Sequence, residues 1–212
     1  DMIKAKLVLS KIGAVEEPVR KMALFELNRA DDTFAIPLIV NLIAEQRDLA
    51  HANPQLKEIL YAKSLYQPEM LLSMLTRESK RENRTVLVEV AGEIRLEGAA
   101  SQLLGILNED EDEMIIKAVI GALGMIGETG ATTAISEYLY SGSLELTIAA
   151  IYALGRLATP TAFQRLAEKL GADPDLDIMI LDVFATDQSP EAIERLNEGL
   201  SSHFAHLRNA AK

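Results

Sequence analysis

Apolar residues recur at intervals of four along the chain, and the resulting ladder itself recurs about every 32 residues. The ladders start at positions 35, 67, 99, 131, 162 and 192, although Gln67 occupies the start of the second. Their apolar members are Ala35, Ile39 and Ile43; Leu71 and Leu75; Ala99, Leu103 and Leu107; Ala131, Ile135 and Leu139; Ala162, Leu166 and Leu170; and Ala192, Leu196 and Leu200. Self-similarity at a fixed period of this length is typical of a stacked array of repeats, not of a single globular core.

Each repeat predicts a pair of helices joined by a short turn. In the fourth repeat, residues 114–126 follow a 3.6-residue period, Gly127 and Gly130 bracket a turn, and a second helix is expected over 131–140. In the fifth repeat the expected helices are 144–157 and 160–170. Pro160 suits the first turn of the latter, where a backbone N–H has no partner inside the helix.

The repeat boundaries predict a single solenoid over residues 1–212, with repeats starting near 15, 49, 82, 111, 143 and 174. Residues 1–13 have the pattern of a partial repeat, and residues 201–212 that of a capping tail. The second repeat is irregular because Pro54 falls inside its expected first helix, which we therefore place at 54–65 after a polar connection over 47–54. Since the chain opens within a repeat, we expect further domains to be fused to it.

Three glycines share one repeat position, seven residues before a ladder start: Gly92, Gly124 and Gly155. Glycine at that place lets the paired helix approach closely, and it can also end a helix as a C-cap. Their recurrence at one position favours a packing role.

Two segments carry a family resemblance, AVIGALGMIGETGATTAISEYL (118–139) and AAIYALGRLATPTAFQRLAEKL (149–170). Each has Ala-Leu-Gly near the end of its first helix, at 122–124 and 153–155, and then a small residue and Leu in its second. This pattern resembles the HEAT repeats, in their short bacterial form that is also called PBS-lyase-like. The resemblance implies an all-α fold, a right-handed α-α superhelix of about six helical hairpins with a partial N-terminal repeat.

The resemblance also implies that the second helix of each hairpin lines a concave face. Positions opposite the ladder are then candidates for partner binding, and they are polar. Two residues after the ladder starts lie Pro37, Glu69, Ser101, Thr133, Gln164 and Glu194, and six after lie Asn41, Ser73, Gly105, Glu137, Glu168 and Glu198. These columns become acidic toward the C-terminus. We therefore predict an acidic groove whose partner-binding residues are Thr133, Glu137, Gln164, Glu168, Glu194 and Glu198.

The net charge of −11 is concentrated in the second half of the chain, where residues 107–212 hold 17 acids and 7 bases. Residues 1–106 hold 15 acids and 14 bases. An acidic surface repels phosphate backbones and anionic lipid, which need clustered Lys and Arg. The sequence thus predicts a protein partner with a basic face and no nucleic acid. The alternative is that the acids only keep the solenoid in solution.

Residues suited to catalysis or metal binding are sparse. The absence of cysteine excludes disulfides and thiolate sites. The three histidines, His51, His203 and His206, do not make a ligand set and are interpreted as surface residues. The acidic run 109–113 lacks the alternating ligands and central Gly of a calcium loop. It is interpreted as helix capping, with a docking patch as the alternative. No cofactor and no metal are predicted.

Three classes of enzyme contain related repeats, and their characteristic residues can be compared with this sequence. Deoxyhypusine hydroxylases hold two irons with His-Glu pairs, and this chain has no His-Glu dipeptide. HEAT-like alkylpurine DNA glycosylases use a basic groove with aromatic residues, whereas this chain is acidic and has no Trp. Phycobilin lyases carry related repeats, but no bilin pocket is marked here.

We therefore predict a protein-interaction scaffold that is not an enzyme. The alternatives are a regulatory or spacer domain of a larger signalling protein or enzyme, and a bilin lyase-like protein. The longest stretch without charge, 33–44, is twelve residues, shorter than the ~18 that a membrane span needs. Without a visible signal peptide, a cytoplasmic location is expected.

Overall fold

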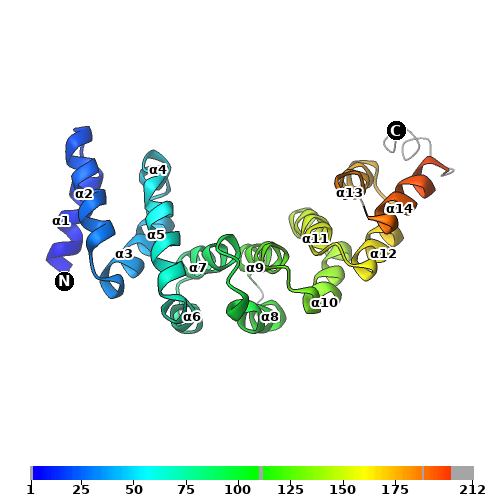
Figure 1. Cartoon of the computed structure of the whole chain (residues 1–212), viewed down its shortest axis with the longest axis horizontal. Helices are drawn as coiled ribbons and strands as arrows, with labels where there is room; N and C mark the ends of the chain where they lie inside the picture. The colour runs from blue at the N-terminus through cyan, green and yellow to red at the C-terminus, as the bar shows by residue number, and fades with distance from the viewer. Residues whose placement is uncertain (1, 110–111, 188, 202–212) are drawn as a thin grey trace. The chain divides into compact units, whose positions relative to one another are not determined.

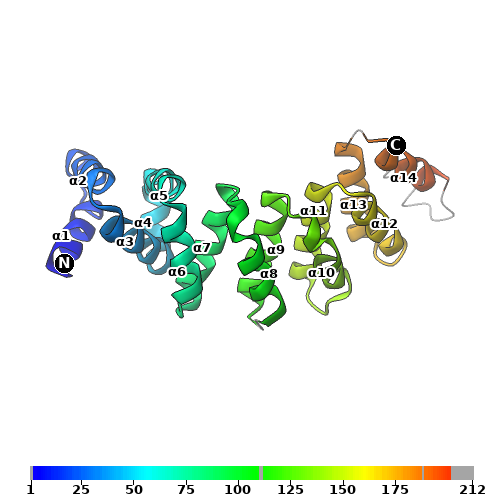
Figure 2. The same cartoon turned by 60° about the horizontal axis from the view of Figure 1, so that its bottom comes forward.

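The structure is a computed structural model that describes residues 2–109, 112–187 and 189–201. Within these ranges it contains fourteen α-helices, three short 3₁₀ helices and no strand. Figures 1 and 2 show the helices from two directions. The predicted fold class, an all-α solenoid of helical hairpins, is confirmed. The chain divides into two compact units, residues 1–99 and 100–212. The expectation of one continuous solenoid stays a prediction.

The first unit consists of seven α-helices and one 3₁₀ helix. They are α1 (Met2–Ile12), α2 (Glu17–Arg29), α3 (Asp32–Glu45), α4 (Arg47–Ala52), α5 (Gln55–Tyr66), α6 (Pro68–Arg77), α7 (Arg81–Glu93) and η1 (Glu97–Ala99). Helix α3 lies at its centre and packs against α5 and α7. This helix contains residues 33–44, the longest stretch without a charged residue, and most of its apolar side chains are buried.

The second unit is more regular. Its elements are α8 (Ala100–Glu109), α9 (Glu113–Ile126), η2 (Thr129–Ala131), α10 (Thr132–Glu137), η3 (Tyr138–Tyr140), α11 (Leu144–Leu157), α12 (Pro160–Lys169), α13 (Pro174–Thr186) and α14 (Pro190–Leu200). The first helices of the pairs form one row, in which α11 packs against α9 and α13. The second helices form another, in which α12 packs against α10 and α14.

The ladder residues form the core of both units. Leu123, Ile135, Leu154 and Leu166 are completely buried, as the repeat pattern predicts. All ladder residues from Ala35 to Leu166 are buried as well. Leu170 and Leu196 are half-buried, and they occupy the end of α12 and the middle of α14. Burial along the ladder therefore decreases in the last two repeats.

The second repeat departs from the expected connection. Residues 47–52 form α4, a short helix, where the sequence predicted a polar connection. Ala50 gives this turn a buried contact, and the buried Asn53 side chain donates to the Leu49 carbonyl at 2.9 Å. Pro54 then precedes α5, which begins at Gln55 and matches the predicted first helix. These few buried contacts accompany a helix in a segment that was predicted to be a loop from its polar composition.

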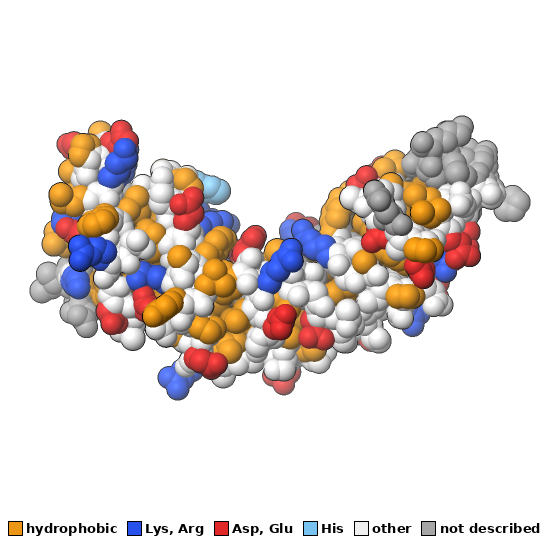
Figure 3. Space-filling model, viewed as in Figure 1, with side chains coloured by type: hydrophobic (Ala, Val, Ile, Leu, Met, Phe, Trp, Pro, Cys, Tyr) orange, Lys and Arg blue, Asp and Glu red, His pale blue; other side chains and the backbone are white. Residues whose placement is uncertain are grey.

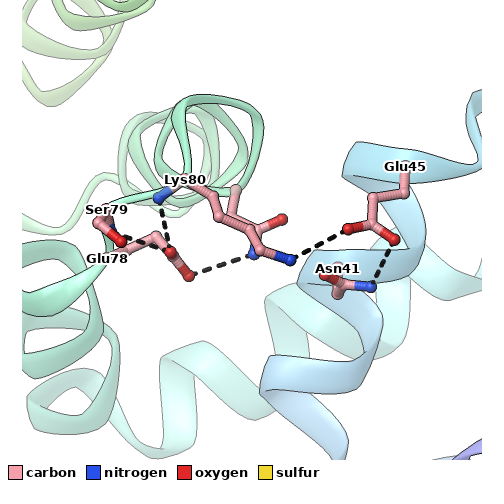
Figure 4. A network of polar contacts seen from close by, with 6 residues as sticks. Asn41, Glu45, Glu78, Ser79 and Lys80 are labelled. Atoms are coloured by element: carbon pink, nitrogen blue, oxygen red, sulfur yellow. Dashed lines mark hydrogen bonds and ion pairs between the residues drawn. The ribbon is translucent and has the colours of Figure 1, made fainter.

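A polar network holds the turn between α6 and α7 against α3 (Figure 4). The Glu78 carboxylate accepts from the backbone N–H groups of Ser79 and Lys80, both at 2.9 Å. Lys80 Nζ lies 3.2 Å from Glu45, which also accepts from Asn41 at 3.1 Å. Because Lys80 and Glu45 are exposed, their ion pair contributes little free energy, and the network mainly satisfies the backbone N–H groups of the turn that precedes α7.

Two of the repeated glycines are sites of close helix packing. A Cβ added to Gly124 would lie 2.8 Å from the Cα of Ala153 on the neighbouring helix α11. One added to Gly155 would lie 2.6 Å from a methyl carbon of Val183 on α13. The predicted packing role is confirmed for both. The alternative C-cap role is wrong, because α9 continues to a cap at Gly127 and α11 to a cap at Ala158.

We expect Gly124→Ala and Gly121→Ala to change stability in opposite directions. Ala at 124 forces the backbones of α9 and α11 apart, so the free energy of unfolding should fall by about 1–2 kcal/mol despite the better helix propensity of Ala. Gly121 lies on the same helix with open space around its Cα, so Ala there should add about 0.5–1 kcal/mol. Urea unfolding followed by circular dichroism measures both. Equal effects of the two substitutions would show that α9 and α11 do not approach as closely as described.

Candidate partner-binding surface

The six predicted partner-binding residues lie on three helices that follow one another in the second unit. Thr133 and Glu137 are on α10, Gln164 and Glu168 are on α12, and Glu194 and Glu198 are on α14. All six are exposed, because the ladder on each helix points to the core and these positions point away from it. We call this surface the ladder-opposite face. The contacts of α12 with both α10 and α14 make it continuous.

Two of its four glutamates are paired within their own helices. Arg165 donates to Glu168 at 3.1 Å, and Gln164 donates to the same carboxylate at 3.0 Å. Arg195 donates to both carboxylate oxygens of Glu198, at 2.9 and 2.8 Å. This hydrogen bonding raises the pKa of Arg195 above its ordinary value. Each of these arginines offsets one negative charge on the face.

Glu137 and Glu194 make no ion pair within the part of the chain that the structure describes. The sequence analysis gave the four glutamates the same role. In the structure, Glu168 and Glu198 are each paired with an arginine, whereas Glu137 and Glu194 are not. The sequence does contain a signal for this pairing. Arg165 and Arg195 each precede a glutamate by three residues, and this spacing brings side chains together on a helix.

The ladder-opposite face is an open surface in the second unit. Figure 1 draws α9, α11 and α13 in one row of the second unit and α10, α12 and α14 in a second row beside it. The expected concave groove stays a prediction. A shallow hollow on α14 is lined by Pro190, Ile193, Glu194, Asn197, Glu198 and Ser201. Figure 3 shows acidic side chains beside hydrophobic ones over α12 and α14.

Other acids of the second unit serve its own structure. Asp112 caps α9 by accepting from the N–H groups of Met114 and Ile115 at 3.0 and 3.3 Å, as the capping interpretation of the acidic run predicts. Asp173 caps α13 in the same way. Glu145 pairs with Lys117 at 2.5 Å, and this hydrogen bond lowers the pKa of Glu145. Asp110 and Glu111 lie outside the described residues.

The comparisons with known proteins agree with the repeat architecture. Residues 68–154 match the family model of HEAT repeats. Residues 68–154 contain HEAT repeats. No curated protein matches this chain at a significant level.

Several solved structures are similar to the HEAT-repeat chain over most of its length. A designed armadillo repeat protein, YIII(Dq)4CqI, is 16% identical, with 97% of this chain and 95% of that one covered and a TM-score of 0.46. The CpcE–CpcF complex of phycocyanin lyase from Nostoc sp. PCC7120 is 17% identical, with 97% and 91% covered and a TM-score of 0.46. Human deoxyhypusine hydroxylase in complex with glycerol is 16% identical, with 98% and 93% covered and a TM-score of 0.38. With TM-scores below 0.5 and identities of 16–17%, these likenesses carry no conclusion about this chain.

Chemistry-bearing residues are few in the described part of this HEAT-repeat chain. His51 is exposed on α4, and His203 and His206 lie outside the described residues. No group of three or more His, Asp or Glu side chains within the described ranges is arranged to hold a metal ion. None of the helices described there combines the length and hydrophobicity that crossing a membrane requires.

Sequence reasoning missed another feature, a set of exposed hydrophobic side chains. Met22 and Phe25 on α2 and Ile193 on α14 are at least half exposed. The missed signal is that α2 and α14 each carry apolar residues outside the positions that face the core, which are Ala23, Leu24 and Leu27 on α2 and the ladder on α14.

Proposed function

We propose that this HEAT-repeat protein is a non-catalytic scaffold and that its ladder-opposite face binds a protein segment carrying Lys and Arg. The observation that carries the proposal is that Glu137 and Glu194 lie on one continuous exposed face and form no ion pair among the described residues. A partner's lysine or arginine would supply the missing cation. The hollow on α14 offers Ile193 and Pro190 as apolar contacts beside these charges.

The compensated glutamates set how strongly this face attracts such a segment. Exposed charges act through water, so they mainly raise the association rate and make binding sensitive to salt. Arg165 and Arg195 repel an incoming cation while they hold Glu168 and Glu198. Binding therefore depends on Glu137 and Glu194 first. A partner must displace an existing Arg–Glu pair to use the other two.

The test is the binding of a fluorescent peptide of alternating Lys and Arg, followed by anisotropy at low and at raised salt. Glu137→Gln combined with Glu194→Gln should weaken binding about 2- to 30-fold, since two exposed ion pairs contribute about 0.2–1 kcal/mol each. The matched control combines Glu58→Gln with Glu93→Gln, two exposed glutamates of the first unit, and it changes the net charge equally. It should bind the peptide as the unaltered protein does.

A substitution that is expected to strengthen peptide binding provides a second test. Arg165→Gln removes the cation that holds Glu168, so it should strengthen peptide binding at low salt and steepen the salt dependence. If the glutamate pair and its control weaken binding equally, the peptide responds only to net charge, and the proposed face is wrong. An unchanged affinity in Arg165→Gln would show that Glu168 takes no part.

A further inference from the structure

Helix α2 carries two apolar stripes, and only one of them is used within the fold. Ala23, Leu24 and Leu27 are buried against the rest of the first unit. Val19, Met22 and Phe25, spaced by three residues, form the other stripe, in which the Met22 and Phe25 side chains are 62% and 61% exposed. Exposed apolar side chains gathered on one helix face are characteristic of a surface that another molecule covers. We call these three residues the α2 stripe.

The segment that contains the α2 stripe has an excess of basic residues, although Lys11 and Lys21 are paired with Glu26 and Glu17. The Arg29 guanidinium lies 5.6 Å from the centre of the Phe25 ring, where the ring face attracts a cation. Arg20 donates to the carbonyls of Ala14 and Val15, at 2.8 and 2.6 Å. Residues 2–29 hold six bases and three acids. In Figure 3, Lys and Arg side chains lie beside hydrophobic ones over α1 and α2. The stripe is an apolar surface with a basic border.

The hollow on α14 has the opposite character. Ile193 is 50% exposed there and lies next to Pro190, while Glu194 and Glu198 lie beside them. Residues 174–200, which form α13 and α14 and their connection, hold seven acids and one base, Arg195. The hollow is thus an apolar surface with an acidic border. It matches the α2 stripe both in its apolar centre and in the sign of the surrounding charge.

We propose that two copies of this chain associate head to tail, with the α2 stripe of one copy against the α14 hollow of the next. Phe25 is the anchor, because a large aromatic side chain removed from water contributes most to such an interface. Arg29 of one copy then lies near Glu194 or Glu198 of the other, which sets the orientation. The inference rests in part on the proposed function, because Glu194 and Glu198 belong to both surfaces.

Head-to-tail contact has a consequence that a symmetric dimer lacks. The two surfaces in contact are different, so each pair of copies retains one free α2 stripe and one free α14 hollow. Association then continues as the concentration rises, unless a ring closes. A contact between two α2 stripes would instead stop at the dimer, and it would also bring like charges together.

Sedimentation velocity over a range of concentrations tests the proposal with two blocking variants of the full chain. Phe25→Glu places a carboxylate in the stripe, and Ile193→Lys places an ammonium in the hollow. Both positions are exposed, so circular dichroism should show unchanged helical content. The unaltered protein should form larger species as its concentration rises, and each variant should raise the dissociation constant at least about tenfold, as loss of a buried anchor does. Leu65→Glu, at an exposed apolar residue of α5, is the control and should associate normally.

Mixing the two variants gives the decisive measurement. The Phe25→Glu chain keeps its hollow and the Ile193→Lys chain keeps its stripe, so an equimolar mixture should form a heterodimer that does not grow further. A mixture that stays monomeric, or an unaltered protein that is monomeric at every concentration, overturns the proposal.

The peptide assay separates this inference from the proposed function. Phe25→Glu leaves the ladder-opposite face intact, so it should bind the Lys-Arg peptide at least as well as the unaltered protein. Loss of self-association with retained peptide binding supports both proposals. Self-association without peptide binding overturns only the proposed function.

Discussion

Replacing Leu154 by Ala is expected to lower the free energy of unfolding by about 2–5 kcal/mol, the range measured for buried leucines. Leu154 is completely buried in α11, which packs against α9, α12 and α13. The substitution removes apolar contact and leaves a cavity that neighbouring helices can fill only by moving. Because Gly124 and Ala153 already hold α9 against α11, little further collapse is possible there. We therefore expect a loss in the upper part of the range.

Leu144→Ala is the matched control, since it makes the same chemical change on the same helix. Leu144 begins α11 and its side chain is 61% exposed, so its loss should cost less than about 0.5 kcal/mol. Urea unfolding compares the two variants. Hydrogen exchange should show the largest loss of amide protection in α9–α12, because each repeat depends mainly on its neighbours for stability. A loss below about 0.5 kcal/mol for Leu154→Ala would show that the ladder has been assigned to the wrong helix face.

The repeat period made the helical pairs and most of the core predictable. A ladder of four-residue spacing defines one helix face, and its recurrence indicates which faces meet. Leu123 and Leu166 are completely buried for this reason. The agreement weakens at Leu170 and Leu196, which are only half-buried. Periodicity gives the direction of a side chain, whereas its burial also depends on how much protein lies beyond it.

Local context explains the elements that the pattern missed. Polar residues 47–52 form α4 because Ala50 finds a buried position, which composition cannot reveal. Gly124 and Gly155 were expected near helix ends, and they lie inside helices that continue for two further residues. Only the position of the neighbouring backbone identifies them as packing sites.

The candidate face was predictable in its residues and less so in its electrostatics and shape. The ladder spacing placed Glu137 and Glu194 on the exposed side of α10 and α14, where they lie. Pairing of Glu168 with Arg165 depends on side-chain rotamers, which the ladder does not specify. The curvature of a solenoid results from small rotations between successive repeats, so the concave side cannot be read from the polarity of a single helix.

A buried ion pair in the first unit was not apparent from the sequence and is expected to be important for stability. Lys63 of α5 extends its ammonium to Asp32 at the start of α3, with 2.6 Å between Nζ and Oδ1. The same Nζ donates at 2.8 Å to the carbonyl of Ala30, the residue that caps α2. The Lys63 and Asp32 side chains are only 10% and 23% exposed. One side chain thus connects three helices of the first unit.

Lys63→Ala should lower the free energy of unfolding by about 2–3 kcal/mol, measured by urea unfolding at neutral pH. Removing one member of a buried pair costs about 3–5 kcal/mol, because the other charge remains without compensation. The lower value is expected here because Asp32 keeps part of its contact with water. Lys21→Ala is the control, since its ion pair with Glu17 is exposed to water and should contribute little to stability.

A double-mutant cycle separates the charge from the packing of the lysine stem. Lys63→Met keeps most of the apolar stem and removes the ammonium, so it should destabilise the protein while Asp32 is present. Adding Asp32→Asn removes the uncompensated carboxylate and should recover at least about 1 kcal/mol of that loss. Strictly additive effects of the two substitutions would mean that Lys63 stabilises the first unit without its ion pair to Asp32, through packing and its hydrogen bond to the Ala30 carbonyl. A recovery, together with a small effect of Lys21→Ala, would identify burial as the reason that this ion pair matters and the exposed one does not.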